Sequence, residues 1–168
     1  MRDYCRCDVA AALKDPGICY SEKDRDIEYL CLLRVAAAME DESLCRDIKS
    51  IDLRDDCLIN VALSKEDINI CDMVSSGRGD SCIVSLLSKA ESHNICERSK
   101  SKTHCLMLAA DHFKNGSICT LIEEDYMRDE CAYSLARSTK NTQYCGFLSS
   151  NEKAAKCRTE VIIMSQMG

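Results

Sequence analysis

The chain has 168 residues, 46% of them hydrophobic, and a formal net charge of −6 at pH 7. This acidity argues against a nucleic-acid backbone as partner, because phosphate binding needs concentrated Lys and Arg. No stretch approaches the roughly 20 apolar residues of a membrane span, and charged residues such as Arg2, Asp3 and Arg6 interrupt any candidate signal peptide. We therefore expect no nucleic-acid binding and no membrane insertion.

Fourteen cysteines set the pattern of the sequence. Apart from Cys7, gaps of 14 residues, such as Cys5 to Cys19, alternate with gaps of 9 to 12 residues, such as Cys19 to Cys31. The resulting period of about 26 residues indicates a repeat protein. This cysteine content is typical of a disulfide scaffold in an oxidising compartment. We expect an extracellular or cell-surface protein, with the cytosol of a hyperthermophile as the alternative.

The sequence divides into a leading half unit and six repeats, which together form a single domain over 1–168. The half unit covers 1–14, where Arg2-Asp-Tyr-Cys5 matches Arg54-Asp-Asp-Cys57 and Arg128-Asp-Glu-Cys131. The repeats cover 15–40, 41–66, 67–91, 92–114, 115–140 and 141–168.

Each repeat is expected to form a short helix around its first cysteine, a tight turn, and a longer helix around its second. Apolar residues stand four and five positions after the second cysteine, which makes one helical stripe. The first of these positions holds Val9, Val35, Val61, Leu86, Ala109, Leu135 and Val161. The second holds Ala10, Ala36, Ala62, Leu87, Ala110, Ala136 and Ile162.

These stripes predict an all-α fold. A single hairpin cannot bury its stripe, whereas stacked neighbours can. The expected architecture is a curved, right-handed α/α superhelical solenoid of about six disulfide-linked hairpins plus an N-terminal half repeat. Its core should include Val35, Ala36, Val61, Ala62, Leu86, Leu87, Leu135 and Ala136.

Polar residues mark the expected ends of the helices. Acidic residues precede the second cysteine, where they suit the positive end of a helix dipole. They are Asp55, Asp80 and Asp129. Residues that favour helix starts precede the first cysteine, as at Asp15-Pro16 and Ser43. In the second repeat the hairpin should turn near Ser50 and Ile51.

Two disulfide schemes fit the spacing. The first scheme pairs the two cysteines of each hairpin and leaves Cys5 and Cys7, which are close enough to pair if the terminus frays. The second scheme bridges the constant gaps, beginning with Cys5–Cys19, and leaves Cys7 and Cys157 at opposite ends of the array. We favour the first, in which each bridge contributes about 3 kcal/mol. Its pairs are Cys19–Cys31, Cys45–Cys57, Cys71–Cys82, Cys96–Cys105, Cys119–Cys131 and Cys145–Cys157.

The tripeptide Arg78-Gly79-Asp80 matches the integrin-recognition motif. The Ser-Ser-Gly sequence at 75–77 predicts an exposed turn before it, which suits presentation of a charged pair. Asp80 also occupies the acidic first-turn position of the repeat, which gives it a structural explanation. The tripeptide is a candidate binding site.

Other residues suggest chemistry only weakly. His93-x-x-Cys96 and His104-Cys105 resemble pairs of metal ligands, but other repeats have no His at these positions, so we expect no metal. No nucleophile elbow, phosphate-binding Gly loop or converging Ser, His and Asp group is present, so we expect no enzyme and no cofactor. Cys5 and Cys7 break the pattern and form a candidate redox pair.

With hairpins and bridges in view, the chain resembles the tetratricopeptide-related cysteine-rich solenoids of bacteria, in which a disulfide pins each helical hairpin. Its repeat is shorter than theirs and its cysteines lie further apart. The pattern Cys-x-x-Ile, Arg-Asp-x-Cys and Leu-Ala also resembles short cysteine repeats of predicted archaeal surface proteins. Neither resemblance carries over a catalytic residue, and both imply a secreted or surface-displayed protein-binding scaffold.

We expect a non-enzymatic scaffold that binds protein or glycan along the face of its longer helices, as a monomer rather than a polymer. Three alternatives are open: a structural protein that assembles end to end, an adhesive protein that uses Arg78–Asp80, and a thiol-based store for copper or zinc. A store needs free thiols around a shared lumen, whereas this spacing groups them in isolated pairs. The polar positions on the longer helices are Glu28, Asp56, Lys65, Asp111, Glu130, Arg137 and Lys156.

Overall fold

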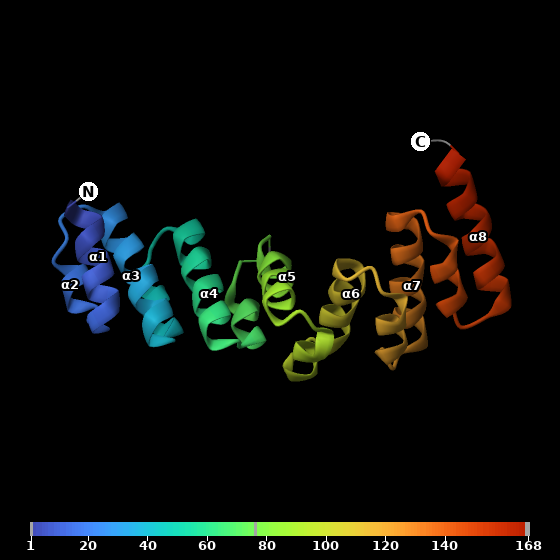
Figure 1. Ribbon diagram of the computed structural model, residues 1–168, viewed down its shortest axis with the longest axis horizontal. Helices are drawn as coiled ribbons and strands as arrows, with labels where there is room; N and C mark the ends of the chain where they lie inside the picture. Colours follow the sequence, from blue (N-terminus) through green and yellow to red (C-terminus); the bar gives the residue numbers. More distant parts are fainter. Residues whose placement is uncertain (1, 76, 167–168) are drawn as a thin grey trace. The chain divides into compact units, whose positions relative to one another are not determined.

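The computed structural model describes residues 2–75 and 77–166, which form helices and connections without a strand (Figure 1). The expected all-α class is confirmed, with regularly spaced disulfides between repeating helical units. The chain divides into two compact units, Met1–Lys89 and Ala90–Gly168. The elements are α1 (Arg2–Leu13), α2 (Gly17–Tyr20), α3 (Arg25–Met39), η1 (Glu42–Asp47), α4 (Ile51–Lys65), η2 (Ile68–Met73), α5 (Gly79–Ala90), η3 (His93–Arg98), α6 (Lys102–His112), η4 (Gly116–Leu121), α7 (Asp125–Thr139), η5 (Thr142–Phe147) and α8 (Asn151–Gln166).

The short element of each repeat is a 3-10 helix, η1 to η5, except in the first repeat, where α2 is a single α-helical turn. Runs of 3-10 helix stay short because their hydrogen bonds have poorer geometry. In the second repeat the N–H of Ile48 donates to the carbonyl of Cys45 at 3.2 Å, and Ile48 itself is extended. The chain then enters α4 at Ile51, which confirms the expected turn.

A left-handed residue followed by a capping residue connects each longer helix to the next short element. The left-handed residues have φ between 48° and 55°, and they are Lys14, Glu40, Glu66, Glu91, Lys114 and Lys140. The side chain of the next residue accepts a hydrogen bond from the N–H two positions later, as in an Asx turn. These residues are Asp15, Asp41, Asp67, Ser92, Asn115 and Asn141.

The expected capping residue is confirmed at Asp15 but wrong at Ser43. Asp15 accepts from the N–H of Gly17 at 2.9 Å. In the second repeat Asp41 is the capping residue, and Ser43 provides the N–H that it binds. The cause is spacing, because the Asx turn places the acceptor two residues before the donor.

Each disulfide joins a short element to the longer helix that follows it. The paired Cα atoms lie 5.4 to 5.8 Å apart. This is the scheme of pairing within hairpins, and the connections between η and α elements bring the two cysteines together. The bridges are Cys19–Cys31, Cys45–Cys57, Cys71–Cys82, Cys96–Cys105, Cys119–Cys131 and Cys145–Cys157.

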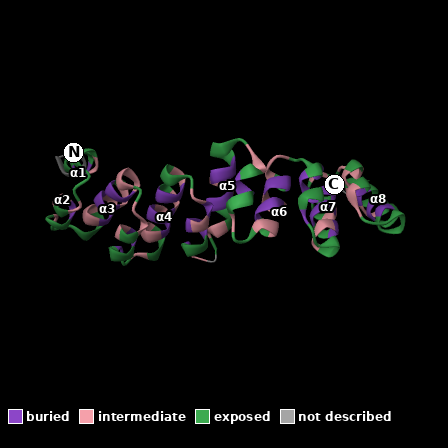
Figure 2. Ribbon diagram, turned by 90° about the horizontal axis from the view of Figure 1, so that it is seen from below, coloured by how far each residue is buried: buried purple, intermediate pink, exposed green. Residues whose placement is uncertain are grey.

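The predicted core is buried. All eight residues that we expected there are at most 2% exposed, and Figure 2 shows buried segments along the longer helices of each unit. At the two ends of the stripe one residue each is exposed rather than buried, since Val9 is 47% and Ile162 is 48% exposed. In the described part of the chain, α1 and α8 each have another longer helix on one side only, so these side chains lack a neighbour to cover them.

Buried aspartates link consecutive repeats, a role that differs from the one expected for them. Asp55 and Asp129 are each the fifth residue of a helix, α4 and α7, and are 1% and 7% exposed. Asp55 accepts hydrogen bonds from the backbone N–H, at 3.2 Å, and the hydroxyl of Ser75. Asp129 accepts the same two bonds from Ser149, both at 2.7 Å. Because a buried carboxylate needs such partners, this Asp–Ser link, rather than a helix dipole, explains both residues.

Candidate functional site

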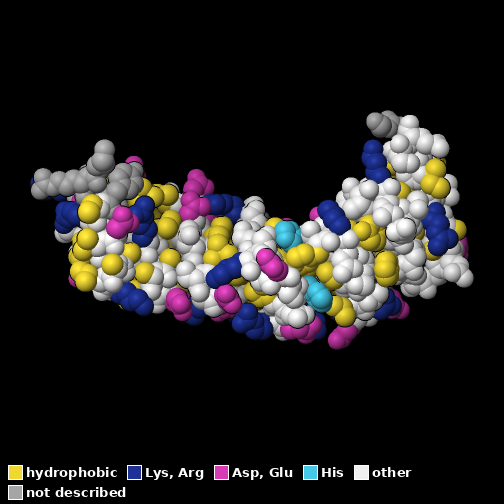
Figure 3. Space-filling view, viewed as in Figure 1, with side chains coloured by type: hydrophobic (Ala, Val, Ile, Leu, Met, Phe, Trp, Pro, Cys, Tyr) yellow, Lys and Arg dark blue, Asp and Glu magenta, His cyan; other side chains and the backbone are white. Residues whose placement is uncertain are grey.

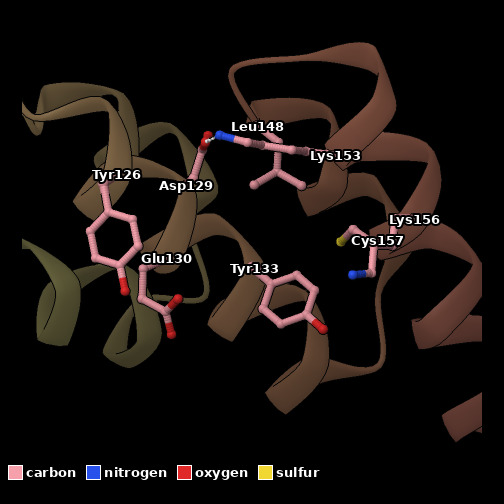
Figure 4. A pocket seen from close by; sticks show the side chains of 8 residues that line it. All are labelled: Tyr126, Asp129, Glu130, Tyr133, Leu148, Lys153, Lys156 and Cys157. Carbon is pink, nitrogen blue, oxygen red and sulfur yellow. Dashed lines mark hydrogen bonds and ion pairs between the residues drawn. The ribbon is translucent and has the colours of Figure 1, made fainter.

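A groove lies between α7 and α8 in the second unit. Its first lobe has a volume of about 220 Å³, and Figure 4 shows the side chains around it. Residues of α7 form one wall, residues of α8 form the other, and Leu148 enters from the connection before α8. The lining is Tyr126, Asp129, Glu130, Tyr133, Leu148, Lys153, Lys156 and Cys157.

The bottom of this first lobe is apolar. Cys157 is fully buried and bonded to Cys145, and together with Val161 these cysteines belong to a buried cluster. Leu148 and Tyr133 are half-buried and pack against it. The disulfide that stabilises the last repeat thus lies buried directly beneath the half-buried side chains of the lobe.

A hydrogen-bonded network holds the upper edge of the lobe. Lys153 donates to Asp129 at 2.7 Å, in addition to the two bonds from Ser149. Burial alone would raise the pKa of Asp129, but the hydrogen bonds from Lys153 and Ser149 outweigh it and lower the pKa below its usual value. Asp129 is therefore an ionised side chain whose hydrogen bonds position Lys153.

Glu130 and Lys156 carry the charges of the lobe that no described residue neutralises. Both stand one position before a disulfide cysteine, on α7 and α8 respectively. They project from the two helices on either side of the Tyr133 ring (Figure 4). Within the described part of the chain neither forms a hydrogen bond or an ion pair. Both were among the polar positions expected on the longer helices.

A second lobe of about 320 Å³ continues along the same two helices and shares Glu130 and Tyr133 with the first. Its other lining residues are Ser134, Arg137, Ser138 and Met164. The Arg137 guanidinium lies 5.5 Å from the centre of the Tyr133 ring, which is a cation–π contact. Tyr133 donates a hydrogen bond to Glu160, and this bond raises the pKa of its phenol.

The first unit differs at the equivalent positions. Asp56 stands where α7 has Glu130, but Arg78 donates to it at 2.5 Å. A hollow of about 520 Å³ lies between α4 and α5, where Lys89 donates to the Leu63 carbonyl at 2.6 Å and pairs with Glu66 at 3.2 Å. The charges beside this hollow are therefore bonded within the protein, unlike those of the α7–α8 groove.

The Arg78–Asp80 tripeptide lies at the start of α5. Arg78 precedes the helix and bonds Asp56 and, at 3.0 Å, the carbonyl of Asp52. Gly79 and Asp80 are already helical, with Asp80 in the first turn. Ser76, part of the expected turn, lies outside the described residues. The arginine thus has partners on α4, and use of the tripeptide in adhesion stays a prediction.

Cys5 and Cys7 are both free thiols on α1, but in different surroundings. Cys5 is exposed and Cys7 is buried, and burial raises the pKa of the Cys7 thiol. Residues two apart on an α-helix point to opposite sides. A bridge between them would therefore require unwinding of α1.

The histidine–cysteine pairs do not come together as metal ligands, since Cys96 and Cys105 are bonded to each other. The described residues include no cluster of three or more His, Cys, Asp or Glu side chains that could hold a metal ion. Among the described helices, none is long and apolar enough to cross a membrane.

Three residues of the first lobe were not singled out from the sequence, namely Tyr126, Tyr133 and Lys153. A weak pattern could have found some of them. Tyr126 and Tyr133 are seven residues apart, which places both on one face of a helix. Asp55 and Ser75 have the same 20-residue separation as Asp129 and Ser149, so the link between repeats is also visible in the spacing.

The fold and the groove together define an all-helical repeat protein of helix and 3-10 units, each held by a disulfide. Comparisons of the chain with protein-family models, curated proteins and solved structures gave no match. Function is therefore inferred from the geometry of the groove.

Proposed function

We propose that this protein is a non-enzymatic repeat scaffold, secreted or displayed at a cell surface, that binds a macromolecular partner along its longer helices. The observation that carries the proposal is the two-lobed groove between α7 and α8. It combines an apolar bottom with Glu130 and Lys156, two charges that the described chain leaves without a partner. An apolar centre with a polar rim is the usual anatomy of a protein-binding surface.

The distribution of constant and variable positions supports this proposal. Disulfides, capping residues and left-handed residues recur in the same places, whereas the position before the second cysteine changes from Asp56 to Glu130 to Lys156. A constant frame that carries varied side chains is how repeat proteins form recognition surfaces. The resemblance to disulfide-pinned surface scaffolds points in the same direction.

The surrounding chemistry supports the remaining parts of the proposal. Six disulfides indicate an oxidising environment, which fits secretion or surface display. Basic and acidic side chains are interspersed on the face shown in Figure 3. Such mixing, with a net charge of −6, suits a protein partner better than a polyanion.

The test uses the whole, oxidised chain and two defined sets of probes, a displayed library of short random peptides and a panel of neutral oligosaccharides. We expect members of at least one set to bind, and Glu130→Lys to weaken that binding. Asp80→Glu is the matched control for the tripeptide, and it should leave binding unchanged. Loss of binding only in Asp80→Glu would instead support adhesion through Arg78–Asp80.

A further inference from the structure

We infer that the α7–α8 groove binds a peptide segment of a partner protein, with an apolar side chain in the first lobe and a backbone amide between Glu130 and Lys156. This inference rests on the proposed binding function and names its ligand. Four features of the groove carry it: the size of the first lobe, its apolar bottom, the placement of its charges and the distance between its lobes.

The size and bottom of the first lobe match one apolar side chain. Its volume of about 220 Å³ is below the about 300 Å³ at which pockets for drug-sized ligands begin. Leu148 and Cys157 at its bottom offer no hydrogen-bonding group. A sugar hydroxyl pressed there would lose its water without replacement, whereas an aromatic or branched aliphatic side chain gains from burial. These features favour a peptide over a glycan.

The charges at the rim match an uncharged amide. The carboxylate of Asp129 is already neutralised by Lys153, so Glu130 and Lys156 are the charges that a ligand meets in the first lobe. A strongly acidic or basic ligand would approach one of them with the same sign. A peptide group has an N–H for Glu130 and a carbonyl oxygen for Lys156, and hydrogen bonds to charged groups are the stronger kind.

The distance between the lobes matches an extended peptide. Tyr126 and Asp129 line only the first lobe, and Ser134, Arg137 and Ser138 line only the second. The shared residues Glu130 and Tyr133 belong to both sets. The mean positions of the two sets on α7 are then about five residues apart, which corresponds to about 7 Å along the helix axis. Alternate side chains of an extended chain point the same way at about the same spacing. A peptide can therefore place residues i and i+2 in the two lobes.

The absence of Trp from the sequence gives a direct measurement of this binding. Peptides are selected from the random library on the immobilised, oxidised chain and resynthesised with Trp at the apolar position. Only the peptide then contributes Trp fluorescence. We expect a blue shift on binding, because the indole enters the apolar lobe, and a Kd obtained by titration.

Charge reversals on the two walls locate the peptide. Glu130→Lys and Lys156→Glu should each raise the Kd by about tenfold or more, since each removes a charged hydrogen bond. Glu152→Lys and Arg158→Glu are the controls: they reverse exposed charges on α8 outside both lobes, and the Kd should not change. Circular dichroism shows whether each variant is folded.

The outcomes separate the ligand from the function. Peptides that bind Glu130→Lys and Lys156→Glu as tightly as the original chain would overturn this inference and the use of the groove, whereas binding elsewhere along the longer helices would remain in place. Oligosaccharides that bind in the groove in place of peptides would overturn this inference alone and leave the binding function in place. If neither probe set binds the original chain, the proposed function itself is wrong.

Discussion

At the residue scale, the left-handed residue after each longer helix is an unusual choice. Only glycine adopts this conformation without strain, and other residues lose about 1–2 kcal/mol, yet these positions hold Lys or Glu. In the fifth repeat Lys140 donates to the Arg137 carbonyl, and Asn141 donates to the Ala136 carbonyl at 3.0 Å. These bonds satisfy carbonyls at the end of α7 and hold Lys140 in the strained conformation.

Lys140→Gly should therefore stabilise the protein. Removal of the Cβ relieves the strain, and the greater freedom of glycine in the unfolded chain cancels part of the gain. We expect the free energy of unfolding to rise by about 0.5–1 kcal/mol, measured by thermal denaturation with the disulfides intact. Thr139→Gly, one position earlier and helical, should instead lower it by a similar amount. A lower stability in both variants would contradict this explanation.

Asp129→Asn should lower the stability in a manner that depends on pH. The pKa of Asp129 is lower in the folded protein, so its contribution is present above the unfolded pKa of about 3.9 and disappears as the pH falls through the folded pKa. We expect a cost of about 2 kcal/mol near neutral pH, and a smaller cost below about pH 4. Urea unfolding of both proteins at pH 7 and at acidic pH measures it.

Asp125→Asn is the matched control for this experiment. Asp125 is on the same helix, and its side chain is 77% exposed beside Arg128. We expect little change in stability at either pH, because exposed ion pairs contribute little. An equal cost of Asp129→Asn at both pH values would mean that the ionised carboxylate is not what stabilises the link.

At the element scale, the hairpin with its disulfide is the basic unit. Non-reduced peptide mapping should join Cys45 to Cys57, whereas a Cys57–Cys71 peptide would contradict the pairing.

Cys5 and Cys7 should be recovered as thiols, with Cys5 alkylated much faster than Cys7. Burial both shields Cys7 and raises its pKa, and the thiolate is the reactive form.

The short elements show how far a sequence pattern can specify an element. The cysteine spacing predicted a short helix around Cys45 correctly. The 3-10 form was not predictable. It follows from two constraints on the six residues Glu42–Asp47: the Asx turn at Asp41 before them, and the disulfide from Cys45 to Cys57. Local propensity does not contain that constraint.

At the scale of the whole molecule, stability should be distributed by neighbours. In a repeat array each unit contacts only adjacent units, and the chain forms two compact units. Asp129→Ala should therefore reduce amide-exchange protection mainly in α7 and α8, with far less effect in 2–75. Hydrogen exchange followed by mass spectrometry measures this. An equal loss of protection along the entire chain would indicate one fully cooperative domain.

The amino-acid sequence by itself determined the repeat, the all-α class, the core stripe from Val35 to Ala136 and the favoured pairing of cysteines. These properties follow from spacing along the chain, which is local and periodic. The ends of the stripe at Val9 and Ile162 could not be predicted, because exposure depends on whether a neighbouring helix is present.

Only the tertiary structure decided which polar residues are bonded and which face a hollow. Asp56 and Glu130 occupy the same position in their repeats, yet Arg78 binds Asp56 and no described residue binds Glu130. Likewise, Asp129 follows the dipole pattern in sequence but is buried against Ser149, 20 residues away. The physical reason is that partners and hollows arise from contacts between successive repeats, and the pattern within one repeat does not specify them.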